Sequence, residues 1–437
     1  MIHICMRQKS EIMALKNYAW ATVESVANTV LQFVALVILT KFLTPSDYGV
    51  WGMMAIFIAV GNLLVDSGLG GALVKDKNPE RIDYNTLFCF NMIVSILFYL
   101  ILFISANAIA GFYDVKELAS YIRIYGLVII ISAFGIVQIT QLVKELRFRE
   151  LAILAIIGNV MGIGVAVIMA LNGFRVWCLV AQQLVAMTVR VILSFVFCRY
   201  VPHVEFSKKS LKKQFGFGGS ILISNMVGTI YGNIVSSIIP KIGTVAQNGY
   251  YLQAAKIKGV PQSILTSVVD KVVFPELSKK SEEEMLPEGR RIIRMVFPVV
   301  SLCFLGCICL AKPIVLIILG EQWVDTIGYL KILLFGGFGS VYMYLARSLY
   351  KASGKTSIIL KTTIIKSLIG IAIIAVSTIW GVWGFIYGFV VISVVNSIIS
   401  AVYLKKYLNY KYRKQLMDLK IGAIIIVISV VCAIIIP

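Results

Sequence analysis

Histidine and acidic residues are scarce in this sequence, and their scarcity excludes several classes of function. The two histidines, His3 and His203, lie outside every long apolar segment, so a histidine proton relay inside a membrane span is excluded. No GxxxxGK[ST] motif occurs, so the chain carries no ATPase of the P-loop type. No glycine-rich dinucleotide-binding loop follows a strand, and we expect no bound cofactor.

The eight cysteines are scattered and show no ligand spacing. Cys303 and Cys307 lie one helical turn apart, but no histidine or carboxylate joins them to complete a metal site. We therefore interpret the cysteines as small apolar packing residues and expect no metal centre.

Long apolar segments dominate what is present. Of the 437 residues, 59% are hydrophobic, which predicts an all-α polytopic membrane protein rather than a soluble domain. A membrane span needs about 20 mainly apolar residues. Thirteen segments meet that length, near 18–40, 50–73, 86–110, 121–143, 152–171, 176–198, 217–239, 250–270, 293–311, 328–348, 358–380, 382–404 and 421–436.

The net charge is +20, and the positive residues are distributed along the chain as the predicted topology requires. Of the 41 Lys and Arg residues, 30 lie in the N-terminal segment and in alternate loops, the pattern that marks the cytoplasmic side of a membrane protein. This bias predicts a cytoplasmic N-terminus. It also argues against nucleic acid as a partner, because membrane topology accounts for most of the positive charge.

Two halves of the chain resemble each other. The segment 38–51 aligns without gaps on 238–251, Tyr121–Ile124 is echoed by Tyr329–Ile332, and Val176-Trp177 by Val382-Trp383. Six spans in each half predict a parallel duplication. The resulting parts are an N-terminal six-helix bundle at 1–203, a cytoplasmic linker at 204–214 and a C-terminal six-helix bundle at 215–405. A basic loop with an extra transmembrane segment follows at 406–437. For 421–436, a full span and a re-entrant segment both remain open.

Ionisable residues within spans are the candidates for function, because charges in lipid usually face a cavity or a partner. The cationic candidates for binding an anion such as a diphosphate are Lys41, Arg123, Lys241, Lys256, Lys258 and Lys331. Lys41, Lys241 and Lys331 lie near helix ends, where they can also reach lipid headgroups. Glu24 and Asp66 are the candidates for coupling to H⁺ or Na⁺. Pairing with a base is the alternative for Glu24, and a helix-end acid is the alternative for Asp66.

Several segments resemble those of the Wzx-type polysaccharide flippases, which belong to the multidrug/oligosaccharidyl-lipid/polysaccharide exporter superfamily. They are Leu43–Gly49, Gly249–Lys256 followed by Pro261, Phe274–Ser278 and Leu319–Trp323. The resemblance implies a MATE-like fold of two six-helix bundles in a V. It also implies transfer of an undecaprenyl-diphosphate-linked oligosaccharide between leaflets by alternating access. The family's cationic positions correspond to Lys41 and Lys256. Thirteen spans depart from the family's usual twelve or fourteen.

Two other functions remain open at this stage: a cation or drug antiporter on the same fold, and a membrane glycosyltransferase or polymerase. An antiporter site would be rich in acids, whereas bases outnumber acids in these spans. The expected partners are the lipid-linked oligosaccharide of an O-antigen, capsule or exopolysaccharide pathway, membrane lipids, and the polymerase and glycosyltransferase machinery. We expect a transporter and no enzyme activity.

Overall fold

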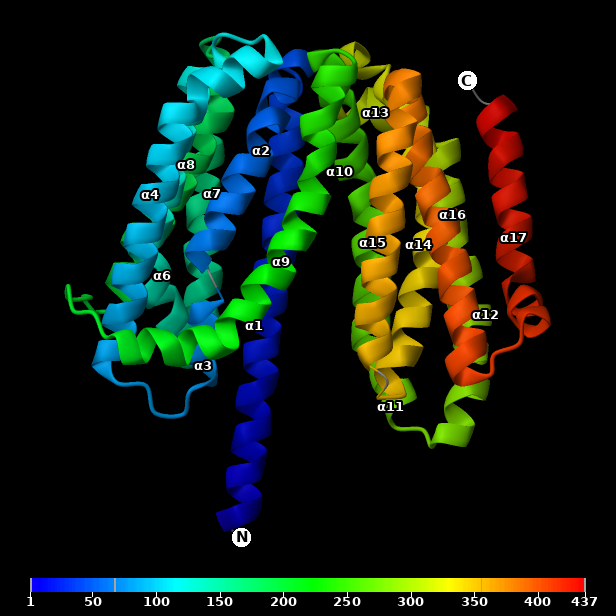
Figure 1. Cartoon of the computed structure of the whole chain (residues 1–437), viewed down its shortest axis with the longest axis horizontal. Helices are drawn as coiled ribbons and strands as arrows, with labels where there is room; N and C mark the ends of the chain where they lie inside the picture. The colour runs from blue at the N-terminus through cyan, green and yellow to red at the C-terminus, as the bar shows by residue number, and fades with distance from the viewer. Residues whose placement is uncertain (1, 67, 355, 436–437) are drawn as a thin grey trace. The chain divides into compact units, whose positions relative to one another are not determined.

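The computed structural model describes residues 2–66, 68–354 and 356–435, with residues 2–18 and some positions of α9 and other helices described as backbone only. Within these ranges every regular element is a helix, which confirms the predicted all-α fold. The chain packs as two compact units, Met1–Lys241 and Ile242–Pro437 (Figure 1). The predicted repeat boundaries place α9 in the second half of the duplication, whereas the packing of the chain groups α9 with the first unit. The two divisions describe different things, and the repeat boundaries stay a prediction.

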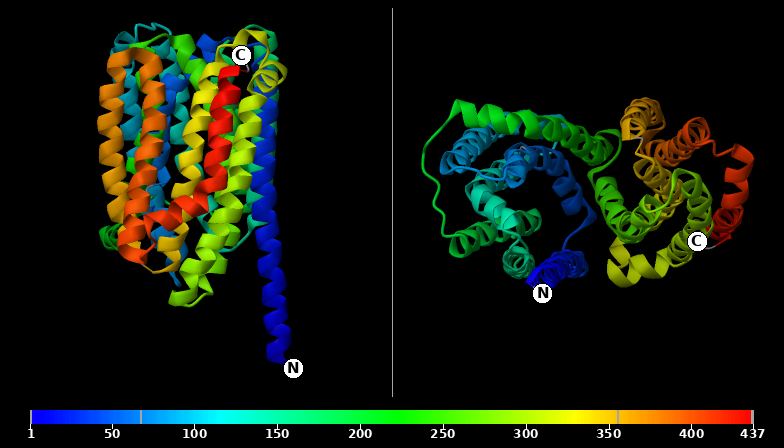
Figure 2. Two further views of the ribbon diagram at one scale, coloured as in Figure 1. Left: turned by 90° about the vertical axis from the view of Figure 1, so that its right-hand side faces the viewer. Right: turned by 90° about the horizontal axis from the view of Figure 1, so that it is seen from below.

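The N-terminal unit is built from nine helices over its described residues. α1 is the longest, and its N-terminal end projects beyond the other helices of the unit (Figure 2). The bounds are α1 Ile2–Leu39, α2 Pro45–Asp66, α3 Leu69–Lys75, α4 Arg81–Tyr113, α5 Leu118–Tyr125, α6 Leu127–Lys144, α7 Phe148–Leu171, α8 Val176–Phe197 and α9 Lys208–Ile242.

The C-terminal unit contains six long helices and several short ones. A π-helical segment, η1, follows α10, and a 3-10 turn, η3, separates α15 from α16. The bounds are α10 Val245–Val268, η1 Val269–Val273, α11 Phe274–Ser278, α12 Glu282–Cys309, α13 Ala311–Ile318, η2 Glu321–Trp323, α14 Thr326–Ala352, α15 Thr356–Ser377, η3 Thr378–Trp380, α16 Gly381–Leu408 and α17 Tyr412–Ile435.

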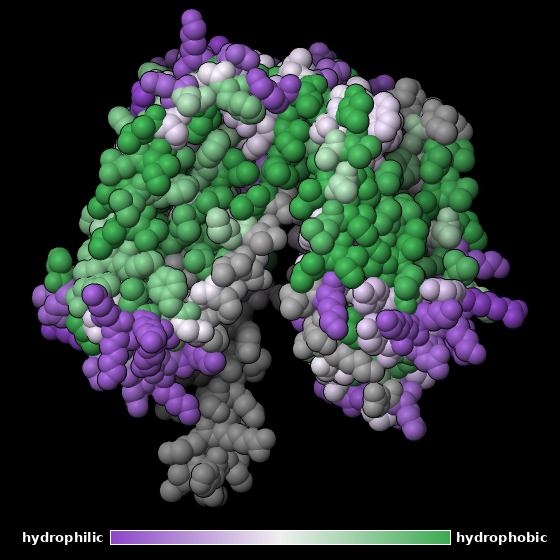
Figure 3. Space-filling model, viewed as in Figure 1, coloured by the Kyte–Doolittle hydropathy of each residue, from purple (hydrophilic) through white to green (hydrophobic). Residues whose placement is uncertain are grey.

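Ten helical stretches of the described chain are long and apolar enough to cross a membrane. They cover eleven of the thirteen predicted segments, because the stretch Lys361–Leu408 contains both α15 and α16. The remaining two segments lie in α9 and α10. α10 carries two lysines and three glutamines, which lower its hydropathy. On the face shown in Figure 3, hydrophobic residues form a band across each unit with hydrophilic residues beyond it. The chain is therefore a multi-pass membrane protein.

The same capping arrangement opens the second span of each half. At α2, the Thr44 amide donates to Asp47 Oδ2 (2.9 Å) and the Asp47 amide donates to Thr44 Oγ1 (3.3 Å). At α10, the Thr244 amide donates to Gln247 Oε1 (2.8 Å) and the Gln247 amide to Thr244 Oγ1 (3.2 Å). Each pair satisfies helix-end amides that no carbonyl within the helix can reach. The two caps stand at aligned positions of the repeat.

An aromatic pair recurs in the same way. The rings of Tyr121 and Trp177 have centroids 4.8 Å apart in the N-terminal unit, and those of Tyr329 and Trp383 are also 4.8 Å apart in the C-terminal unit. Each pair joins the start of the fourth span of its half to the start of the sixth. Contacts of this kind contribute about 1 kcal/mol beyond the buried area. Shared three-dimensional contacts support the duplication independently of the sequence alignment.

The residue before the sixth span of each half also has unusual backbone geometry. Arg175 has φ 45° and its repeat counterpart Gly381 has φ 67°. Glycine adopts such angles freely, whereas a side chain there is strained by about 1–3 kcal/mol. Arg175 nevertheless places its Nε 3.1 Å from Asp47 Oδ1, and the Asp47 side chain is almost wholly buried. The residue with the strained backbone thus also supplies the positive charge that neutralises the buried Asp47 carboxylate.

We predict that Arg175→Gly is more stable than Arg175→Ala by about 1 kcal/mol, the reverse of the usual order. Both variants lose the ion pair, but only glycine relieves the backbone strain. Thermal unfolding in detergent measures the difference. The control is the same two substitutions at Phe174, where φ is negative and alanine should be at least as stable. Equal stability of the two Arg175 variants would contradict the strain argument.

The C-terminal helix α17 is an unbroken helix of 24 residues, and its stretch Tyr412–Ala433 is long and apolar enough to cross a membrane. Its attachment depends on Asp418, whose side chain is fully buried. Asp418 accepts from Arg290 Nε (2.6 Å), Arg294 Nε (2.5 Å) and the Tyr410 hydroxyl (2.6 Å). Gly422 allows close approach to α12, because a Cβ there would lie 2.1 Å from the Phe297 ring. Figure 2 shows α17 running beside α12.

Asp418→Asn should lower the free energy of unfolding by about 3 kcal/mol, because it leaves two arginines beside a buried neutral amide. The measurement is the unfolding transition of the purified protein in detergent. Glu288→Gln is the matched control, because it removes a carboxylate from a weak ion pair. That pair is long, at 3.8 Å, and its partner Arg291 is largely exposed. That control should change stability by less than about 1 kcal/mol. A wild-type transition for Asp418→Asn would show that α17 is held by apolar packing alone.

Candidate functional site

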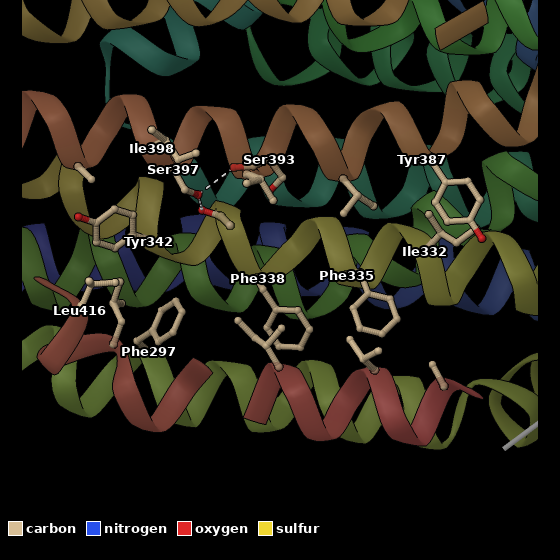
Figure 4. Close-up of a pocket in the computed structure, with 18 of the residues that line it drawn as sticks. Phe297, Ile332, Phe335, Phe338, Tyr342, Tyr387, Ser393, Ser397, Ile398 and Leu416 are labelled. Atoms are coloured by element: carbon tan, nitrogen blue, oxygen red, sulfur yellow. Dashed lines mark hydrogen bonds between the residues drawn. The ribbon is translucent and has the colours of Figure 1, made fainter. Parts of the chain in front are cut away.

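A groove of about 1220 Å³ lies within the C-terminal unit, between α12, α14, α16 and α17 (Figure 4). Its wall is mainly aromatic and aliphatic. The labelled side chains that form it include Phe297, Ile332, Phe335, Phe338, Tyr387 and Leu416. Lys331 is the one charged residue among the described residues that line it.

Several of the polar atoms that line this groove are already bonded within the protein. Ser393 Oγ donates to the Gly336 carbonyl (2.6 Å), and Ser397 Oγ donates to the Gly339 carbonyl (3.2 Å). The Tyr342 hydroxyl donates to Gln415 Oε1 (2.6 Å). A site that binds sugars needs many available donors and acceptors, whereas most of this lining is apolar, so the groove suits hydrocarbon rather than saccharide.

Arg123 and Lys331 occupy aligned positions of the two halves. Arg123 Nη2 donates to Asn107 Oδ1 (3.0 Å), Arg123 Nε donates to the Phe103 carbonyl (3.4 Å), and the guanidinium lies 4.9 Å from the Phe103 ring centroid. These partners all belong to α4, so Arg123 joins α5 to α4. Lys331 lies in the groove instead. The structure therefore gives two aligned cations different surroundings.

Lys41 and Lys241 also occupy aligned positions and differ. Lys241 Nζ is 3.4 Å from Asp114 Oδ2 and 4.7 Å from the Phe112 ring centroid. Lys41 lies exposed in the turn after α1, and the described residues offer its side chain no ion pair. A ligand at Lys241 would compete with Asp114, whereas Lys41 needs no such exchange.

Lys256 and Lys258 lie near the middle of α10 on different faces, with Lys256 exposed and Lys258 half-buried. Gln253 lies one turn before Lys256 and is fully buried. Neither its amide nitrogen nor its amide oxygen has a hydrogen-bond partner among the described residues. An unpaired buried amide is unusual and marks a site that a ligand or water completes. Sequence reasoning missed Gln253, because neither burial nor the absence of a partner can be read from a pattern.

The two acidic candidates are not brought together by any described contact. Glu24 is half-buried on α1, and no cation in the described part of the chain ion-pairs with it. Asp66 is the last residue of α2, and its side chain lies outside the described residues. Both remain predictions.

The segment joining α8 to α9, residues 198–207, is held on the N-terminal unit. Asn85 of α4 is fully buried and accepts from the Tyr200 hydroxyl (2.7 Å) and the His203 amide (3.0 Å). Its own amide donates to Glu205 Oε2 (2.7 Å). The sequence predicts a surface linker here, and the structure adds the contacts that fix it.

The first turns of α9 continue these contacts. Ser210 donates to Asp83 Oδ1, and Gln214 Nε2 donates to the Asp83 carbonyl (3.0 Å). Lys213 Nζ is 2.6 Å from Asp76 Oδ2, which lowers the pKa of Asp76 and raises the pKa of Lys213. Phe215 packs on the core formed by α3, α4 and α6.

We expect the Asp76–Lys213 pair to hold the start of α9 across neutral pH and to release it at either extreme. The lowered pKa of Asp76 means that its contribution is present above its ordinary value of 3.8 and is lost as the pH falls below it. The raised pKa of Lys213 means that its contribution is present below 10.5 and is lost as the pH rises beyond it.

Hydrogen exchange of residues 204–214, corrected for intrinsic rates, should therefore be constant from about pH 5 to about pH 9. Asp76→Asn should speed exchange throughout that range. Lys209→Gln is the control, because Lys209 is exposed and makes no contact with Asp76. Unchanged protection in Asp76→Asn would show that the hydrogen bonds of Asn85, Ser210 and Gln214 hold the segment without the Asp76–Lys213 pair.

The fold and its long apolar helices define a class, that of multi-pass helical membrane proteins. The chain is similar over 94% of its length to a lipid II flippase MurJ in an inward closed conformation, with a TM-score of 0.72, 12% identity and 97% of that chain covered. At this identity the likeness shows the fold alone.

The chain belongs to the polysaccharide biosynthesis protein family, whose pattern matches residues 38–328. This confirms the resemblance carried by its motifs. It is 26% identical over 376 residues to an uncharacterised membrane protein in the cps region of Klebsiella pneumoniae, covering 85% of this chain and 77% of the relative. It is also 26% identical over 313 residues to the succinoglycan biosynthesis transport protein ExoT of Rhizobium meliloti (strain 1021). That match covers 70% of this chain and 63% of the relative.

Proposed function

We propose that this protein is a flippase that moves an undecaprenyl-diphosphate-linked oligosaccharide from the cytoplasmic to the periplasmic leaflet of a bacterial inner membrane. The observation that carries the proposal is the family match over residues 38–328. The relative named as a transport protein and the flippase-like fold support transport rather than catalysis. The positive-inside distribution of Lys and Arg supports a cytoplasmic N-terminus.

Such a substrate combines a charged diphosphate, a polar saccharide and a long apolar chain, and each part needs a different environment. Lys256 offers an exposed cation near the middle of α10. A charge at the centre of a span costs about 3 kcal/mol in lipid, so an exposed lysine there fits a wet, polar surface. The groove of the C-terminal unit offers an apolar wall for hydrocarbon.

Movement of the charged head group needs a driving force, which we assign to an H⁺ or Na⁺ gradient acting through Glu24 or Asp66. The product would be consumed by a polymerase and the substrate supplied by glycosyltransferases, which are the partners that this reaction sequence requires. The excess of bases over acids in the spans disfavours a cation antiporter.

Lys256→Ala should slow delivery of the oligosaccharide to the periplasmic leaflet by about tenfold or more, because a charge-assisted contact contributes about 1.5–3 kcal/mol. Delivery is measured with a lectin probe in a strain that lacks the gene. Lys256→Arg, which keeps the charge, should restore most of the rate.

Lys312→Ala is the matched control, since Lys312 is exposed on α13 and its removal changes the net charge equally. Its delivery rate should equal that of the wild type. A wild-type rate for Lys256→Ala at normal expression would reject the assignment of Lys256. Normal delivery in the strain without the gene and without a second exporter would reject the flippase.

A further inference from the structure

Polar side chains of three helices meet within the C-terminal unit, apart from the groove. The Tyr350 hydroxyl of α14 donates to the Ser400 carbonyl of α16 (3.0 Å), and Lys366 Nζ of α15 donates to Ser400 Oγ (2.7 Å). Ser400 therefore joins α14 and α15 to α16. Arg347 lies one turn before Tyr350 on α14, so both side chains leave the same side of that helix.

Arg347 and Lys366 are near enough for their positive charges to repel each other. Neither has an ion pair with a carboxylate in the part of the chain that the structure describes. The neighbouring Lys351 differs, because its Nζ is 3.3 Å from Asp270 Oδ1 and 4.9 Å from the Phe274 ring centroid.

Some arginines of this chain have carboxylate partners. Arg147 pairs with Glu150, Arg175 with Asp47, and Arg290 with Asp418. Arg347, like Arg123, has no carboxylate partner among the described residues.

Lys366 also lies deep along α15. It lies ten residues after Thr356, so its Cα is about 15 Å along α15 from the start of the helix. An ammonium at that depth is expensive in hydrocarbon, and Ser400 satisfies only one of its three N–H groups. Arg347 is exposed and offers five further donors in a planar fork. The arrangement has donors and charge for an anion, and it has no anion of its own.

We propose that Arg347 and Lys366 together bind a phosphate group carried by a membrane lipid. The guanidinium matches two phosphate oxygens in a bidentate contact, and the ammonium supplies a point charge beside it. Two sources present this chemistry: the diphosphate of a polyprenyl carrier, and the headgroup of an anionic phospholipid. The first source rests on the proposed function, and the second does not.

Native mass spectrometry of the purified full-length protein tests the site with four probes. They are undecaprenyl diphosphate, undecaprenol, phosphatidylglycerol and phosphatidylcholine. Arg347→Gln and Lys366→Gln should each weaken binding of a phosphate-bearing probe by about tenfold, because each removes a charge-assisted contact. Undecaprenol, which has no phosphate, should bind all variants equally.

Lys361→Gln is the matched control. Lys361 is exposed on the same helix, five residues from Lys366 and on another face, and its substitution removes the same charge. Its affinities should equal those of the wild type. Arg347→Lys keeps the charge and loses the fork, so it should bind with intermediate affinity, and it replaces Arg347→Gln if that variant does not fold.

The pattern of losses identifies the source. A loss confined to undecaprenyl diphosphate assigns the site to the transported lipid, and an equal loss for phosphatidylglycerol assigns it to a headgroup. If the wild type bound phosphatidylglycerol at this site but did not bind undecaprenyl diphosphate, the site would stand and the flippase proposal would fail. Wild-type affinity of folded Arg347→Gln and Lys366→Gln for both phosphate-bearing probes would overturn the site.

Discussion

Hydrocarbon offers no hydrogen bonds, so every polar group that enters the bilayer must find its partner within the protein or its ligand. This constraint explains the all-helical architecture, and it also explains the side-chain contacts that hold the helices together. Asp418 enters a span because Arg290, Arg294 and Tyr410 surround it. Where partners are missing, as at Arg347, the same constraint points to a ligand.

The duplicated halves keep the contacts that build a bundle and differ in the charges that a function would use. Both retain the threonine cap and the tyrosine–tryptophan pair. The Asp47–Arg175 ion pair of the first half has only Gln247 and Gly381 as its counterparts in the second. A pseudosymmetric fold can thus carry an asymmetric charge distribution.

The sequence predicted where the helices lie, because length and hydropathy determine which segments can cross a membrane. It placed the last span at 421–436, whereas α17 begins at Tyr412. In the sequence, Asp418 is a charged residue that argues against a span. In the structure, arginines of α12 neutralise that charge. It could not show that Arg123 contacts α4, that Gln253 is buried without a partner, or that four separate helices form the groove. These features depend on helix rotation and on contacts between distant segments.

The proposed flippase activity requires that this chain carries a lipid-linked oligosaccharide across a bilayer. The most direct test is to reconstitute the purified protein in liposomes with a fluorescent undecaprenyl-diphosphate-linked oligosaccharide and to add a membrane-impermeant quencher. For a flippase, we expect all of the fluorescence in protein-containing vesicles to become accessible to the quencher, while protein-free vesicles lose only the outer-leaflet signal. Equal quenching of the two vesicle populations, with and without an imposed ion gradient, would contradict the proposed flippase activity.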